Sequence, residues 1–357
     1  MGNATTALED HDAIRVLPAS ALLANFKPIE TIVDGLPIPR GGLTCITANT
    51  GHGKTTAATL LAVALCRGTP FAGREVSRGS VLVLAGENPD DYLGHLVATL
   101  QECGLTADDV SREGGHLLIV PGTFDIAYQL NRLKLNCSGA KFVAVIVDTS
   151  AAYLLADEEN DNVQMRRHAE MLRCLAELPG NPAVVVLCHP TKRAAQDALL
   201  PRGGGSFLNE ADANLTMWKD DAGILTMHWQ GKIRGPSFEP VRFELVPVEL
   251  TGYRDSRDKP VWSSIVRYIA DARAEQIERR ELGEEDRILA VLRSHRAPSV
   301  TDIGHFAGIV NGAGEVKKST VDRKLRRLME AGLVDQGRGG AWRLTGKGEK
   351  EAAGLSV

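Results

Sequence analysis

The chain has 357 residues, of which 43% are hydrophobic and 24% charged, and its formal net charge is −4. This composition is that of a globular protein and excludes a disordered or fibrous chain, and the length predicts about two domains. No apolar run approaches the ~20 residues that span a bilayer, so we expect no membrane-embedded segment. Six scattered cysteines without a CxxC pair, and the lack of a basic and then apolar leader, predict a reduced cytoplasmic protein without a zinc cluster.

Short apolar runs alternate with longer stretches of helical spacing over most of the chain. Several of the runs are apolar at successive residues, which is typical of strands buried on both faces of a parallel sheet. The expected strands are 43–47, 80–85, 116–120, 142–147 and 183–188, and the expected helices between them are 55–66, 92–103, 126–137 and 162–178. The alternation predicts a doubly wound α/β domain, and β-branched runs at 222–229 and 241–245 predict further strands at its edge.

Changes in composition divide the chain into four parts. Polar residues 1–26 predict an N-terminal arm, 27–250 the α/β domain, and 251–282, rich in turn formers and charges, a linker. The last part, 283–357, has three short helical patterns followed by a hairpin with glycines at its tip. That order predicts a small winged helix-turn-helix domain with helices at 285–294, 300–307 and 317–331 and a hairpin at 333–344.

A phosphate-binding pattern lies between the first expected strand and helix. Residues 48–55 are Ala-Asn-Thr-Gly-His-Gly-Lys-Thr, a P-loop in which Ala48 replaces the usual first glycine. Its glycines let backbone N–H groups surround phosphate oxygens, while Lys54 would reach the β- and γ-phosphates and Thr55 would ligate Mg²⁺. We therefore expect ATP and Mg²⁺ as cofactors. The expected nucleotide-binding residues are Asn49, Thr50, Gly51, His52, Gly53, Lys54, Thr55 and Thr56.

Two acidic residues follow buried strands. Asp148 ends the run 142–147, where a carboxylate can hold Mg²⁺ through its water shell. Glu87 follows the strand after the P-loop helix, where it could orient the attacking water or accept its proton. A helix-capping aspartate and a solvated turn glutamate are the alternatives.

Four further segments follow in a specific order: the acidic stretch 156–162, Cys188-His-Pro-Thr-Lys192, Pro201-Arg-Gly-Gly-Gly-Ser206 and Gly231-Lys-Ile-Arg-Gly-Pro236. Together with a glutamate after the second strand, this order resembles hexameric RecA-like helicases, namely the plasmid replicative helicase RepA group and, more distantly, the DnaB replicative helicases. The resemblance covers residues 28–248. It implies a RecA-like core in which Lys54, Thr55, Asp148 and Glu87 take the lysine, magnesium, Walker B and catalytic-base roles.

The resemblance also implies a homo-oligomer, expected as a hexameric ring, with active sites shared between subunits. His189 would sense the γ-phosphate and relay it to a loop whose Lys192 and Arg193 contact single-stranded DNA in the channel. Arg202 or Arg234, the latter with Lys232, would stabilise the transition state in a neighbour's site. For each of these residues an ordinary core or surface role is the alternative.

Residues 317–327 carry six basic residues and one acidic residue. A helix with such a face can lie in the major groove of DNA, although many similar modules dock proteins instead. The expected DNA contacts are Lys317, Lys318, Arg323, Arg326 and Arg327. The sequence thus predicts an ATP-hydrolysing DNA motor, a helicase of plasmid or phage type. The alternatives are an ATP-switched DNA-binding regulator and an accessory ATPase that does not unwind DNA.

Overall fold

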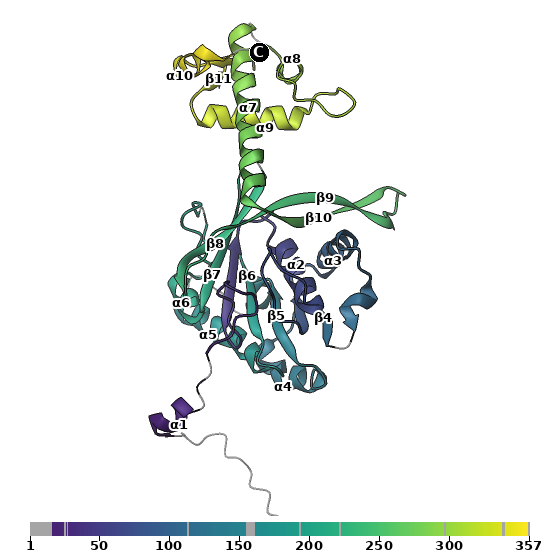
Figure 1. Ribbon diagram of the computed structural model, residues 1–357, viewed down its shortest axis with the longest axis vertical. Coiled ribbons are helices and arrows are strands. Elements are labelled where there is room, and N and C mark those ends of the chain that lie inside the picture. The colour runs from purple at the N-terminus through teal and green to yellow at the C-terminus, as the bar shows by residue number, and fades with distance from the viewer. Residues whose placement is uncertain are drawn as a thin grey trace, which may run out of the picture.

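A computed structural model of the chain describes residues 16–24, 26, 28–112, 114–154, 161–192, 194–220, 223–295, 298–337 and 340–355. The main body is built on a ten-stranded sheet of order β10-β9-β8-β7-β1-β6-β5-β2-β4-β3, and a two-stranded sheet lies in the C-terminal part (Figure 1). In the part of the chain so described, no helix combines the length and the apolar character needed to cross a membrane.

The centre of the large sheet is parallel. Its six parallel strands are β7 (Ala213–Lys219), β1 (Leu43–Ala48), β6 (Ala183–Cys188), β5 (Phe142–Asp148), β2 (Ser80–Ala85) and β4 (Gly115–Pro121). Strands β1, β2, β5 and β6 are buried at every residue, because helices cover both faces of the sheet. The predicted α/β fold and its five central strands are therefore confirmed.

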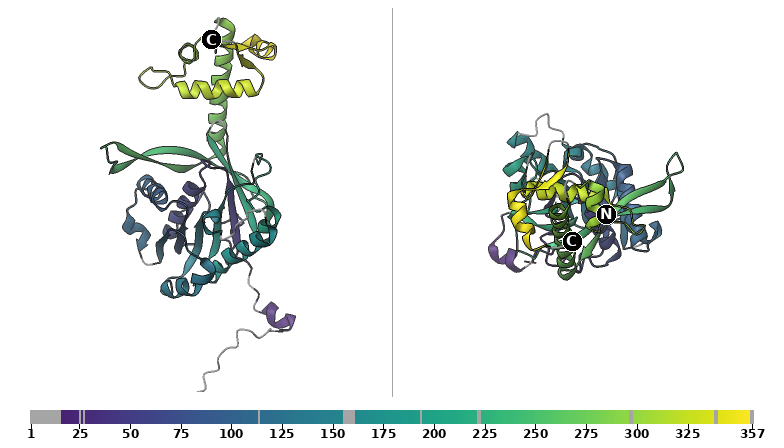
Figure 2. Two further views of the ribbon diagram at one scale, coloured as in Figure 1. Left: turned by 180° about the vertical axis from the view of Figure 1, so that it is seen from behind. Right: turned by 90° about the horizontal axis from the view of Figure 1, so that it is seen from above.

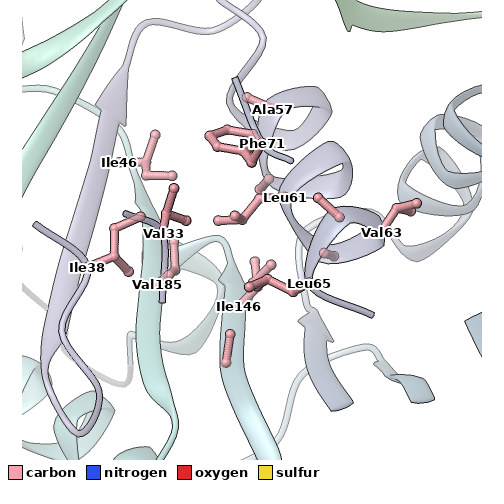
Figure 3. Close-up of a cluster of buried hydrophobic side chains, with 14 of the residues drawn as sticks. Val33, Ile38, Ile46, Ala57, Leu61, Val63, Leu65, Phe71, Ile146 and Val185 are labelled. Carbon is pink, nitrogen blue, oxygen red and sulfur yellow. The ribbon is translucent and has the colours of Figure 1, made fainter. Parts of the chain in front are cut away.

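Helices pack on opposite faces of the sheet through two separate apolar clusters. Helices α2 (Lys54–Arg67) and α3 (Pro89–Glu102) cover one face. Helices α4 (Ile126–Asn136), α5 (Asn162–Arg173) and α6 (Gly204–Glu210) cover the other. Figure 3 shows Leu61 and Leu65 of α2 against Ile146 of β5 and Val185 of β6. This packing fixes the start of α2, and with it the P-loop, above the edge of the sheet.

One side of the sheet is extended by antiparallel strands. They are β8 (Ile224–Ile233), β9 (Val241–Arg254) and β10 (Pro260–Ile269). At the opposite edge, β3 (Ser111–Arg112) pairs with β4. The hairpin of β9 and β10 projects beyond the main body (Figures 1 and 2). Neither β7 nor β10 was expected from the sequence.

The expectation of a linker over 251–282 is wrong for its first part. Residues up to Arg254 continue β9, and β10 returns along it to bury Ile265 and Val266. The turn formers and charges that suggested a linker form the hairpin tip, where the Asp255 carboxylate accepts hydrogen bonds from the backbone N–H of Arg257 and Lys259. The remainder, from 271 onward, is helix.

The C-terminal part follows the predicted order of elements, with one helix more. It contains α7 (Asp271–Ser294), α8 (Val300–Phe306), α9 (Lys318–Glu330), the β11 (Val334–Gln336) and β12 (Trp342–Leu344) pair, and α10 (Gly346–Glu351). The second half of α7 belongs to this part, because Ile288 and Val291 are packed with Leu325 of α9 and Trp342 of β12. At the other end of the chain, α1 (Ala19–Ala24) has no buried residue.

Candidate nucleotide-binding site

A cavity of about 300 Å³ lies where the central parallel strands end. Carboxyl ends of neighbouring parallel strands share one edge of a sheet, so residues that follow β1, β2, β5 and β6 meet there. The lining residues are Thr50, Gly51, Gly53, Lys54, Thr55, Thr56, Glu87, Asn88, Asp91, His95, Asp148, Thr149, His189, Leu245 and Ser264. Five residues expected from the sequence to act on the nucleotide, Lys54, Thr55, Glu87, Asp148 and His189, are thus brought together.

The P-loop has the geometry that an anion needs. Gly51 and Gly53 adopt φ values of 77° and 71°, and a Cβ on Gly53 would lie 2.8 Å from the Leu225 side chain. Gly53 is the N-cap of α2 and has no side chain to cap the first N–H groups of the helix, so a phosphate can accept hydrogen bonds from them. The Lys54 ammonium donates to the carbonyls of Ala48 at 2.9 Å and Asn49 at 3.3 Å, and burial lowers its pKa. Backbone N–H donors, the Lys54 ammonium and the Thr55 hydroxyl are together the groups that can bind a triphosphate.

Two residues expected to bind the nucleotide stand outside the cavity lining. The His52 ring accepts a hydrogen bond at Nδ1 from the backbone N–H of Lys219 at 3.0 Å and packs edge-on against Trp218. It therefore ties the P-loop to the end of β7. Asn49 contributes its carbonyl to Lys54. Both residues therefore stabilise the loop through contacts outside the cavity.

Asp148 and Thr55 lie together as a magnesium site requires. Asp148 is buried, and this burial raises the pKa of its carboxyl group to about 6, although a hydrogen bond with the Thr55 side chain acts in the opposite direction. A hydroxyl and a carboxylate are oxygen ligands of the kind that Mg²⁺ prefers, the carboxylate often through water. This pair of side chains could hold Mg²⁺.

The Glu87 carboxylate is held above the end of β5. Its Oε2 accepts a hydrogen bond from Thr149 Oγ1 at 2.9 Å, and His189 Nε2 lies 3.7 Å from the same oxygen. The backbone N–H groups of Gly86 and Glu87 both donate to the Asp148 carbonyl, at 2.8 and 3.1 Å. Burial first, and then the charge of Lys54, lower the pKa of His189. A carboxylate next to a neutral imidazole at a phosphate site is suited to proton transfer from water.

A family model described as an AAA domain matches residues 8–195, more than half of the chain. The chain belongs to this AAA domain family. No curated protein matches it. The AAA domain belongs to the P-loop class of ATPases, which implies that the chain binds a nucleotide. The match ends shortly after His189, and the strands from β7 onward lie beyond it.

The two candidate finger arginines have different surroundings. Arg202 is half-buried in its own chain, where its backbone N–H donates to the His189 carbonyl at 2.8 Å and it lines a small cavity with His189 and Cys188. Arg234 lies outside the nucleotide cavity and pairs with Asp212 at 2.8 Å. Lys232 beside it donates to the Asn209 carbonyl. Of the two, Arg234 is the one with an exposed side chain.

The expected DNA-binding residues are only partly placed on an exposed face. Lys192, Lys317, Lys318, Arg323 and Arg326 are exposed, whereas Arg193 lies outside the described residues. The last of the expected contacts, Arg327, is half-buried and forms an ion pair with α7.

Ion pairs with α7 explain this difference on α9. Arg327 Nη1 lies 3.1 Å from Glu285 Oε1, and Lys324 is 2% exposed and 3.3 Å from Glu284. The number of basic residues in a segment cannot reveal which of them form ion pairs within the protein, because the paired glutamates lie some 40 residues earlier in the chain. The expected basic face is therefore smaller than the sequence suggested.

Proposed function

We propose that the chain hydrolyses ATP with Mg²⁺. The observation that carries this proposal is the convergence of Lys54, Thr55, Asp148, Glu87 and His189 on one cavity. In the reaction the water oxygen bonds to the γ-phosphorus, the bond from that phosphorus to the bridging oxygen breaks, and ADP leaves. Glu87 accepts the proton of the water, and Lys54 and the P-loop N–H groups stabilise the negative charge. Mg²⁺, when held by Thr55 and Asp148, neutralises phosphate charge.

We further propose that hydrolysis drives movement on DNA by a homo-oligomer, as in RepA-like helicases. The support is the loop between His189 and Arg202. Its two ends are joined by the Arg202 N–H to His189 carbonyl bond and by a bridge between Pro190 and Pro201, so a shift of His189 moves both ends. Lys192 on this loop is exposed and can track phosphates without reading sequence.

A specific observation favours a second candidate, an ATP-switched DNA-binding regulator. Ser264 of β10 lines the nucleotide cavity, and β10 passes through the single residue Ala270 into α7, which carries the C-terminal elements. A nucleotide that shifts β10 would then act on α9, whose exposed Arg323 and Arg326 suit duplex DNA.

One experiment tests both candidates. Rates of ATP hydrolysis are measured without DNA, with single strands and with duplex, beside an unwinding assay on a forked substrate. A motor predicts strong stimulation by single strands together with unwinding. A regulator predicts duplex binding that depends on the bound nucleotide, without unwinding. No hydrolysis under any condition would contradict the proposed ATPase.

A further inference from the structure

We propose that Thr149 is a positioning residue that holds the catalytic carboxylate of Glu87. The proposal rests on the proposed hydrolysis of ATP. No motif of the sequence marks this threonine. Its proposed task is to orient the carboxylate that receives the proton of the attacking water. The decisive contact is the 2.9 Å hydrogen bond from Thr149 Oγ1 to Glu87 Oε2.

Glu87 needs such a contact because its side chain is 53% exposed. An exposed glutamate samples many rotamers, and only some direct the carboxylate at a water over the γ-phosphate. A threonine hydroxyl has one proton to donate. Given to Oε2, that proton restricts the rotation of the carboxylate, and Oε1 can then accept a hydrogen bond from the water.

Thr149 itself is immobilised. The residue is 2% exposed, and the preceding residue, Asp148, ends the buried strand β5. The Asp148 carbonyl accepts the N–H groups of Gly86 and Glu87. Glu87 is therefore attached to the end of β5 twice, once through its backbone and once through its carboxylate.

The residue after Thr149 is anchored as well. His168 Nε2 of α5 lies 3.0 Å from the Ser150 hydroxyl and 3.1 Å from the Ser150 carbonyl. Burial lowers the pKa of His168 to about 4, so the ring is neutral near pH 7, and its single proton lies on Nε2 because a carbonyl only accepts. Thr149 thus stands between two fixed neighbours, which suits a residue that orients another.

A buried threonine can also serve packing alone, and the two roles predict opposite results. Thr149→Val keeps the shape and loses the hydroxyl, whereas Thr149→Ser keeps the hydroxyl and loses a methyl group. A packing role requires the valine variant to perform well and the serine variant poorly. A positioning role requires the reverse order.

The experiment compares these variants in the full chain by their steady-state rates of ATP hydrolysis in the presence of Mg²⁺. We expect Thr149→Val to lower kcat about tenfold or more, equivalent to about 1.4 kcal/mol, with KM within about twofold. Thr149→Ser should keep most of the wild-type kcat. If the valine variant does not fold, Thr149→Ala is compared with Thr149→Ser, because these two variants differ only in the hydroxyl. The opposite order of kcat, or equal values, would overturn the assignment.

Two controls separate this proposal from the one on which it rests. Thr44→Val removes another buried threonine hydroxyl, bonded to the Pro37 carbonyl, and should leave kcat unchanged. Glu87→Gln should abolish turnover. Hydrolysis that Glu87→Gln abolishes but Thr149→Val leaves intact would overturn the Thr149 assignment alone. No hydrolysis by the unaltered protein would overturn the proposed function and the assignment together.

Discussion

Arg234 is held by Asp212, whose Oδ1 lies 2.8 Å from the guanidinium Nη1. Asp212 is buried and also accepts hydrogen bonds from the Leu43 N–H and from Arg173, so it is a fixed anchor. The Arg234 side chain is 65% exposed. In the homo-oligomer proposed above, such an arginine, bound at its guanidinium yet open to solvent and outside its own nucleotide cavity, could act on a neighbouring subunit.

Mixing subunits tests this role. Lys54→Ala protein lacks a working P-loop and keeps its arginines, and Arg234→Ala protein has the reverse defect. We expect each pure variant to bind its partners yet turn over little ATP, while mixtures regain part of the activity, because one interface combines an intact P-loop with an intact arginine. The measurement is the hydrolysis rate against the mixing ratio.

Arg202→Ala provides the matched comparison. Arg202 lies beside His189 in its own chain, so we expect its mixtures with Lys54→Ala to regain nothing. If mixed oligomers form and Arg234→Ala mixtures also stay inactive, Arg234 does not act between subunits.

Lys54→Ala alone should abolish hydrolysis and weaken nucleotide binding, since the ammonium is the one cation of the P-loop. The Lys54 side chain is bonded only to P-loop carbonyls among the described residues, so the fold should persist. Turnover and the binding of a fluorescent nucleotide are measured, with circular dichroism as the check on folding. Normal turnover in the folded variant would refute the phosphate site.

Binding of the magnesium nucleotide should weaken as the pH falls through about 6. Burial raises the pKa of Asp148 to about that value, and a protonated carboxyl no longer attracts Mg²⁺. The affinity for nucleotide with Mg²⁺ is compared at pH 7.5 and pH 5. Asp148→Asn should bind weakly at both pH values; an equally strong pH dependence in that variant would place the titrating group elsewhere.

The stability of the AAA domain should fall in mild acid because of His168. Its pKa is lowered from 6.5 to about 4 by burial, so between these values the unfolded chain takes up a proton that the folded chain does not. The free energy of unfolding should therefore decrease as the pH falls from 6.5 to 4, by up to about 3 kcal/mol from this group. Urea unfolding of His168→Gln should show a smaller decrease, whereas replacement of the exposed His305 should leave the decrease unaltered.

Reversing the charge of Arg323 and Arg326 should weaken binding to duplex DNA. If both residues contact phosphates, the slope of log affinity against log salt should flatten by about 0.9 for each contact. As a control, the charges of the exposed Arg132 and Lys141 in the AAA domain are reversed. This variant has the same change in net charge and should bind duplex DNA as the unaltered protein does. An unaltered isotherm for the α9 variant would assign the C-terminal part to protein docking.

Local patterns were enough to predict five of the six parallel strands, all but β7, and the P-loop. A parallel strand covered on both faces is apolar at most of its positions, so β2 and β6 can be recognised in the sequence, and their predicted bounds are the observed ones. The P-loop is equally local, because its glycines and Lys54 act within eight residues. Glu87 and Asp148 could be predicted as site residues as well, because each is the first charged residue at the end of an apolar strand.

Only the tertiary structure decided which residues meet. Thr149 is 62 residues from Glu87, and Ser264 is 169 residues from His95, whose ring it contacts in the wall of the cavity. The edge strand β10 was missed because its charged neighbours resemble a linker until they are paired with β9. A hydroxyl, a carboxylate or an arginine carries no sign of its distant partner in its own segment, because hydrogen bonds and ion pairs depend on distance in space.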